Sequence, residues 1–254
     1  MSGILNRHGF LILTVCSAGC WWYAGTKGTT LPDAATIDQR MFEAPIQEAT
    51  TLKPFNVQWD DKPYRVQPRF SYDIHGLVVS EHHSDSLFDF YHRMTGDFFN
   101  VCDLAMVWGV NAKTGIYKKG KFRNQDFTAW VEYDNGADWF TFRMSEFSNN
   151  HLITENASIR RTLKRIAVGD QVHIKGWLAE YYSPPNYHRG TSTSRDDTGG
   201  RACETIYVTH AEVIQSANTG WRLLHTAGKV LTLTFVGIQL VALVGKLKRS
   251  SAPV

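Results

Sequence analysis

A cluster of histidines and carboxylates lies in the segment Ser80–Arg93, which reads SEHHSDSLFDFYHR. Imidazole and carboxylate groups are the usual protein ligands of zinc and related metals. If the second half of this segment is helical, Asp85, Asp89 and His92 share one face at spacings of four and three residues. The alternative is a solvent-exposed helix start, in which Asp85 only complements the helix dipole. The candidate metal ligands are His82, His83, Asp85 and Asp89.

A second segment, Arg189–Glu204, reads RGTSTSRDDTGGRACE and is rich in hydroxyl groups, glycine and arginine. Hydroxyls, backbone N–H groups at glycines and a guanidinium group bind phosphates or carboxylates well. The alternative is that these side chains bond the neighbouring backbone, with Arg195 paired to an acid. A serine nucleophile would need an adjacent general base, and the sequence places none. The candidate ligand-binding residues are Thr191, Ser192, Thr193, Ser194 and Arg195.

Two cysteines, Cys102 and Cys203, fall outside the apolar ends of the chain and form a candidate disulfide. Such a bridge would close a loop of about 100 residues and stabilise the fold by roughly 4–5 kcal/mol in the chain-entropy model. Two unbonded thiols are the alternative.

The composition narrows the class of protein. The chain has 254 residues, with a charged fraction of 20% and an aromatic fraction of 13%, which is typical of an ordered globular protein. A net charge of only +3 provides no strongly basic face, so nucleic acid is an unlikely partner. We expect no cofactor.

The N-terminal residues 1–26 are predicted to form a membrane anchor. The run Gly9–Gly25 carries no charge, Arg7 precedes it, and the aromatic residues Trp21–Tyr23 lie near its end. A positive flank and an aromatic belt are typical of a membrane segment. At about 17 residues the run is at the lower limit for a spanning helix. A cleaved signal peptide or a lipidated Cys20 are the alternatives.

The C-terminal residues 217–254 are predicted to form a transmembrane helix with a basic tail. Val230–Gly245 is uncharged and is followed at once by KLKR. A buried strand is the alternative, because LTLTF alternates with period two. The positive-inside rule then places both termini in the cytoplasm. We therefore predict a protein of the bacterial inner membrane whose main domain is periplasmic.

Between these ends, residues 27–69 are predicted to form a proline-rich extracytoplasmic linker, and residues 70–216 a folded domain. Five of the eight prolines fall in the first part, where they disfavour long helices. The second part alternates between strands and one helix. The predicted strands are Phe70–Ser80, Asp103–Asn111, a hairpin over Phe127–Phe142 turning at Asn135-Gly136, Gln171–Tyr182 and Glu204–Ile214.

The predicted helix, Ala157–Ala167 with Thr154 as its N-cap, falls between the third and fourth strand regions. This order resembles the OB-fold, so we predict a mainly β chain: a small OB-like Greek-key barrel with one helix, flanked by two terminal transmembrane helices. In such a barrel the loop 183–203 joins the last two strands, a position that commonly helps to bind the ligand.

Several strings, GLVVSEHHSDS, VWGVN, SNNHL and KGWLAEY among them, are similar to those of a family of uncharacterised bacterial membrane-anchored envelope proteins. The resemblance covers roughly Phe70–Ile214 and implies an envelope setting, but it implies no activity. We therefore predict a binding or assembly subunit of an envelope complex, with protein partners and the membrane as its contacts. The alternative function is a metal-dependent enzyme or metal-binding factor built on the cluster at residues 82–92.

Overall fold

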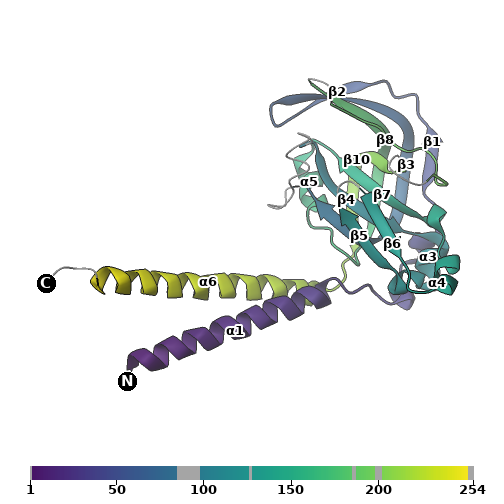
Figure 1. Ribbon diagram of the computed structural model, residues 1–254. Helices are drawn as coiled ribbons and strands as arrows, with labels where there is room; N and C mark the ends of the chain where they lie inside the picture. The colour runs from purple at the N-terminus through teal and green to yellow at the C-terminus, as the bar shows by residue number, and fades with distance from the viewer. Residues whose placement is uncertain (1, 85–97, 126–127, 185–186, 198–201, 251–254) are drawn as a thin grey trace. The chain divides into compact units, whose positions relative to one another are not determined.

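The computed structural model describes the chain apart from residues 1, 85–97, 126–127, 185–186, 198–201 and 251–254. The chain divides into two compact units. One, the helix pair, combines residues 1–30 with residues 218–254. The other, the folded unit, is Leu31–Ala217 and contains every strand that the structure describes (Figure 1).

The described residues form five α-helices and four short 3-10 helices. The α-helices are α1 (Ser2–Gly28), α3 (Gly109–Thr114), α4 (Gly136–Thr141), α5 (Ala157–Leu163) and α6 (Thr219–Ser250). The 3-10 helices are η1 (Ala34–Thr36), η2 (Gln39–Phe42), η3 (Ile116–Lys119) and η4 (Met144–Glu146).

The chain is rich in β-sheet, as the alternating patterns predict. The strands are β1 (Ile46–Ala49), β2 (Phe55–Trp59), β3 (Lys62–His83), β4 (Asn100–Val107), β5 (Lys121–Gln125), β6 (Thr128–Glu132), β7 (Phe147–Ile153), β8 (Gln171–Ser183), β9 (Tyr187–Arg189) and β10 (Glu204–Gln215). Only β5 and β6 stand apart from the main sheet, as a two-stranded ribbon among the described strands.

The main sheet contains a circuit of five strands. β3 pairs with β4, β4 with β7, β7 with β10, β10 with β8, and β8 again with β3. All of these pairs are antiparallel except β7 with β10, which is parallel. The long strand β3 pairs with β8 along one part of its length and with β4 along another, so it bends between two neighbours.

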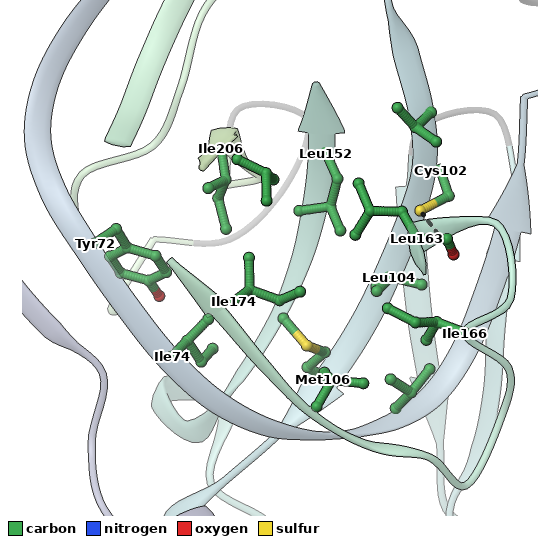
Figure 2. Close-up of a cluster of buried hydrophobic side chains, with 14 of the residues drawn as sticks. Tyr72, Ile74, Cys102, Leu104, Met106, Leu152, Leu163, Ile166, Ile174 and Ile206 are labelled. Carbon is green, nitrogen blue, oxygen red and sulfur yellow. Dashed lines mark hydrogen bonds between the residues drawn. The ribbon is translucent and has the colours of Figure 1, made fainter. Parts of the chain in front are cut away.

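The inward-facing side chains of this circuit form the principal core. Figure 2 shows residues of the largest cluster, among them Ile74, Leu104, Leu152 and Ile174, each fully buried. Each comes from a different strand; Ile74 and Ile174 lie between polar neighbours, whereas every residue of β4 is buried. The core therefore explains the period-two pattern from which β3 and β8 are predicted.

The segment predicted as a linker belongs to the folded unit from Leu31 onward. It supplies β1, β2 and the first part of β3, paired in register with the rest of the sheet. Prolines are tolerated in these strands where the regular pairing of backbone N–H groups ends or is interrupted. Pro63 is next to the end of a hairpin, and Pro68 lies at an irregularity in the pairing of β3 with β8.

The predicted hairpin over residues 127–142 is replaced by a strand and a helix. β6 pairs with the preceding strand β5, and Asn135 caps α4 by accepting a hydrogen bond from the backbone N–H of Asp138. Asn-Gly is a preferred hairpin turn, but Asn is also a preferred N-cap of a helix. The local sequence therefore fits both structures equally well. Similarly, α5 is capped by Asn156 rather than Thr154.

Within the helix pair, α1 and α6 pack side by side and run in opposite directions. Successive positions of α1 meet successively earlier positions of α6 through hydrogen bonds. The contacts join Thr14 Oγ1 to Gln239 Nε2 at 2.6 Å, Ser17 Oγ to Thr232 Oγ1 at 3.0 Å, and Trp21 Nε1 to His225 Nε2 at 3.2 Å. The backbone of Gly228 approaches that of Trp21 so closely that a Cβ would lie 2.9 Å from its nitrogen.

The outward surface of this helix pair is apolar. Its exposed large side chains include Leu11, Ile12, Leu13, Val15, Val230, Leu231, Leu233, Leu240 and Val241. Among the described residues one helix, α6 over Thr219–Gly245, is long and apolar enough to cross a membrane. The predicted N-terminal anchor is helical over Ser2–Gly28.

Candidate functional site

The described parts of the polar segment, residues 189–197 and 202–204, contact the start of β10 and bond extensively to one another. The Ser192 hydroxyl contacts the carboxylate of Asp197 at 2.7 Å and accepts from the backbone N–H of Ser194. The Ser192 N–H donates to the carbonyl of Cys203 at 2.8 Å, and Ser192 is itself buried. This part of the segment is therefore held down by its own side chains, which is the alternative interpretation of its composition.

Of the remaining candidate ligand-binding residues, some make hydrogen bonds within the protein and others expose their side chains to solvent. Arg195 donates to the backbone carbonyl of Pro45, and Gln47 donates to the backbone carbonyl of Thr193. Thr191 Oγ1 accepts from the backbone N–H of Thr205 at 2.9 Å. The side chains of Thr193 and Ser194 are exposed. The predicted five residues are thus contiguous in space, but their polar groups do not converge on one point.

Next to this segment, three strands present a row of buried polar residues. Asp103 on β4 lies opposite His151 on β7, and His151 lies opposite Thr205 on β10. Asp103 and Thr205 are fully buried and His151 is almost so. Strand side chains alternate, so these residues lie on the face opposite the core cluster that contains Leu104 and Leu152.

Arg189 completes this row as a charged network. Its Nη2 lies 2.8 Å from His151 Nε2, while His151 Nδ1 lies 2.7 Å from Asp103 Oδ1. A guanidinium group can only donate, so His151 Nε2 must accept, and the ring proton lies on Nδ1. A neutral imidazole therefore connects a buried carboxylate to a half-buried guanidinium group. Because both ring nitrogens are engaged, His151 is not placed to act as a general base.

Asp103 is kept ionised by its neighbours. Burial by itself would raise its pKa, but His151 and a 2.6 Å hydrogen bond from Asn100 Nδ2 lower the pKa below its ordinary value. A buried carboxylate without compensation is costly, so this network matters for folding. The hydrogen bonds from Asp103 through His151 fix the orientation of the Arg189 side chain, and Arg189 in turn holds the start of the polar segment in place.

Glu204, the first residue of β10, is in the opposite situation. Burial raises the pKa of its carboxyl group to about 8, although Arg195 acts to lower it. Its Oε2 is buried and has no hydrogen-bond partner in the described part of the chain. The side chain therefore carries a proton at neutral pH. A buried acid with a perturbed pKa is a candidate functional group, and here it lies under the polar segment.

The predicted disulfide is not formed. Cys102 and Cys203 are both thiols; Cys102 Sγ lies 4.0 Å from the carbonyl of Leu163 (Figure 2), and Cys203 Sγ lies 3.6 Å from Asn149 Nδ2. The two cysteines belong to opposite sides of β7, whose neighbours are β4 and β10. Two strand spacings amount to roughly 9–10 Å, beyond the ~7 Å that a disulfide spans between Cα atoms.

The predicted metal cluster is described only in part, because Asp85 and Asp89 lie outside the described residues, as does His92. His82 and His83 end strand β3, opposite Asp103 and Cys102. Adjacent residues of a strand point to opposite faces, so one ion cannot readily collect both imidazoles. His83 Nε2 lies 3.2 Å from the carbonyl of Ile166.

A groove of about 540 Å³ opens between the β2–β3 hairpin and the β8–β9 hairpin. Its lining includes Asn56, Tyr64, Arg65, Tyr182, Tyr187 and His188. The rings of Tyr182 and His188 stack with centroids 4.5 Å apart. Three of these lining residues come from or flank the predicted binding loop 183–203, but they belong to strands β8 and β9 rather than to residues 191–195.

Several site residues are missed by sequence reasoning, namely Asp103, His151, Arg189 and Glu204. One signal was available: SNNH, at Ser148–His151, is a run of four polar residues between apolar positions. All four are buried in β7. Such a run is unusual for a strand, but its partners come from β4, β9 and β10, and local pattern does not identify them.

Comparisons with protein-family models, with curated proteins and with solved structures find no match to this chain. The resemblance to a family of envelope proteins therefore stays a prediction.

Proposed function

We propose that this protein is a membrane-anchored binding or assembly subunit of a bacterial envelope complex, with its folded unit outside the cytoplasm. The observation that carries the proposal is the polarity of the helix pair. Polar side chains such as Thr14, Ser17 and Gln239 face the partner helix, while leucine, isoleucine and valine face outward. In water this arrangement is unfavourable, whereas in hydrocarbon polar groups are stabilised by pairing between helices.

The orientation of the proposed anchors follows from the basic residues at the two ends. Arg7 precedes the apolar part of α1, and Lys246, Lys248 and Arg249 follow the apolar part of α6. Positive charges are retained on the cytoplasmic side, so both termini are assigned to the cytoplasm and the folded unit to the periplasm.

A reporter that is active only in the cytoplasm tests this topology. Inserted near Lys119 in the folded unit, it is expected to be silent; fused after Val254, it is expected to be active. The fusion after Val254 serves as the matched control, because it reports on expression of the same chain. Activity near Lys119 together with silence after Val254 would exclude the proposed orientation.

The strand circuit supports an OB-like barrel as the scaffold of the folded unit. Five strands close on one another through β3, β4, β7, β10 and β8, and α5 lies between β7 and β8 in the chain. The parallel pair of β7 with β10 is consistent with a Greek-key order. On such a scaffold the loops at one end of the barrel bind the ligand.

We propose the groove beside the β8–β9 hairpin as the contact with an acidic segment of the partner. Arg65 is exposed in it, and the rings of Tyr182 and His188 offer a stacked surface. Aromatic and arginine side chains are the residues that most often dominate binding energy at interfaces.

Co-purification of the full chain in mild detergent tests this contact. Arg65→Ala is expected to reduce recovery of the associated protein at least about tenfold, since loss of a dominant contact costs about 2 kcal/mol or more. Arg123→Ala, at an exposed arginine paired with Glu132 on the separate ribbon, is the matched control and should leave recovery unchanged. Equal recovery with both variants would place the contact elsewhere.

A further inference from the structure

Three neighbouring strands each carry two polar residues, spaced by one apolar residue, on the same face of the sheet. They are Asp73 and His75 on β3, His173 and Lys175 on β8, and His210 and Glu212 on β10. The intervening Ile74, Ile174 and Ala211 belong to the core or pack against it.

The register of the three strands places these residues side by side in rows across the sheet. His173 lies directly opposite His75 on one side and directly opposite Glu212 on the other. The imidazole rings of His75 and His173 stack, with centroids 3.9 Å apart and planes at 11°. Three strands far apart in the sequence thus deliver their side chains to one patch, separate from the polar segment and the groove.

Distances within the patch are short enough for a shared ligand. His173 Nε2 lies 2.7 Å from Asp73 Oδ1. One ligand atom each from Asp73, His75 and His173 lies within 4.8 Å of the others, and the same holds for His173, His210 and Glu212. Ligand atoms around a tetrahedral zinc ion lie about 3.3–3.6 Å apart, so binding requires Asp73 and His173 to separate slightly and the stacked rings of His75 and His173 to turn until their nitrogens converge.

The first group is the better organised of the two. Asp73, His75 and His173 are all partly buried, whereas His210 and Glu212 are exposed. Immobilised ligands lose less conformational entropy when an ion binds. A hollow of about 310 Å³ also opens beside Asp73 and His75, with Arg40 and Glu43 in its lining, so an ion and a water molecule have access.

One cation already contacts this group. Lys175 Nζ lies 2.9 Å from Asp73 Oδ2, and its side chain is half exposed and free to turn toward solvent.

We propose that Asp73, His75 and His173 bind one divalent transition-metal ion of the zinc type. Two imidazoles and one carboxylate suit zinc and its neighbours, whereas calcium and magnesium prefer oxygen ligands. Three protein ligands leave one position for water or for a side chain of a partner. The site lies on the folded unit and does not depend on the proposed membrane anchoring.

Zinc titration of the full chain, purified in detergent without a histidine tag, tests the site. The wild type is expected to bind one ion, with visible absorption when Co²⁺ replaces zinc. His173→Ala and His75→Ala should each weaken binding by more than the about 10- to 100-fold that loss of an outer-shell partner costs. Lys175→Met should tighten binding several-fold, because it frees Asp73 from a competing cation.

Two controls make the test specific. His188→Ala removes an exposed histidine that also faces a carboxylate, Glu180 at 3.4 Å, outside the patch, and should leave binding unchanged. The double variant His82→Ala with His83→Ala removes two histidines of the cluster predicted from sequence, and it should also leave zinc binding unchanged. The proposal is overturned if the wild type binds no zinc, if His75→Ala retains full affinity, or if only the His82/His83 variant loses the ion.

Discussion

Glu204→Gln is expected to make the protein more stable at pH 8 and to flatten the dependence of its stability on pH. The pKa of Glu204 in the folded protein is about 8, against an ordinary value of 4.5. Between these values the folded state keeps the proton that the unfolded state releases, so the free energy of unfolding falls as pH rises. Over this window the loss amounts to as much as about 5 kcal/mol.

Glutamine stays neutral throughout this window, so the variant lacks that loss. Below pH 4.5 both proteins carry a neutral side chain at this position, and their stabilities should be similar. The neighbours of Glu204 contribute in opposite directions, since Asp197 raises its pKa and Arg195 lowers it. Burial is the dominant cause, so the effect should persist at high salt.

Thermal unfolding of the full chain in detergent, followed at several pH values between 4.5 and 8.5, measures this effect. The difference between variant and wild type should grow with pH. Glu132→Gln, at an exposed acid on β6 that is paired with Arg123, is the matched control and should shift little at any pH. Parallel pH profiles for Glu204→Gln and wild type would show that Glu204 is ionised in the folded protein.

Arg189→Met is expected to destabilise the folded unit by about 1.5–3 kcal/mol, the usual contribution of a hydrogen bond made by a charged group. Arg189 contacts His151 at 2.8 Å, and His151 connects it to the fully buried Asp103. Methionine keeps much of the side-chain volume but removes the positive charge. The Asp103 carboxylate keeps its hydrogen bonds from His151 and Asn100, but His151 Nε2 loses its donor and the carboxylate loses a nearby positive charge.

The double variant Asp103→Asn with Arg189→Met should recover a large part of this loss, because neither charge is then left alone. Such recovery is measured as a non-additive term in a double-mutant cycle. Arg195→Met provides the comparison within the same segment, since Arg195 donates to a neutral carbonyl, that of Pro45, and its loss should cost only about 1 kcal/mol. Additive effects of the two substitutions would mean that Asp103 and Arg189 are not coupled.

The strands and the terminal helices could be predicted because their signals are local. Ile74 alternates with Asp73 and His75, and Ile174 alternates with His173 and Lys175, so each strand can be recognised without its partners. The uncharged run at Val230–Gly245 likewise predicts α6 from its own composition. These features depend on neighbours in sequence, which the sequence displays directly.

Local signals failed where one residue suits two structures. Asn135-Gly136 suits a turn, but Asn135 is the N-cap of α4. Pro63 and Pro68 indicate a linker, but both fit into β3 because of where that strand is paired. In each case the outcome was decided by the free energy of long-range packing, which exceeds the local preference.

By itself, therefore, the sequence determined which residues alternate in strands, which end segments are apolar helices, and which side chains could carry chemistry. Only the tertiary structure decided which of those side chains meet. His75 reaches His173 across about 100 positions of the chain through the register of β3 with β8, and Arg189 reaches His151 from a separate hairpin. Register is set by pairing between strands that are distant in the sequence, so it cannot be predicted from the periodicity of any one strand.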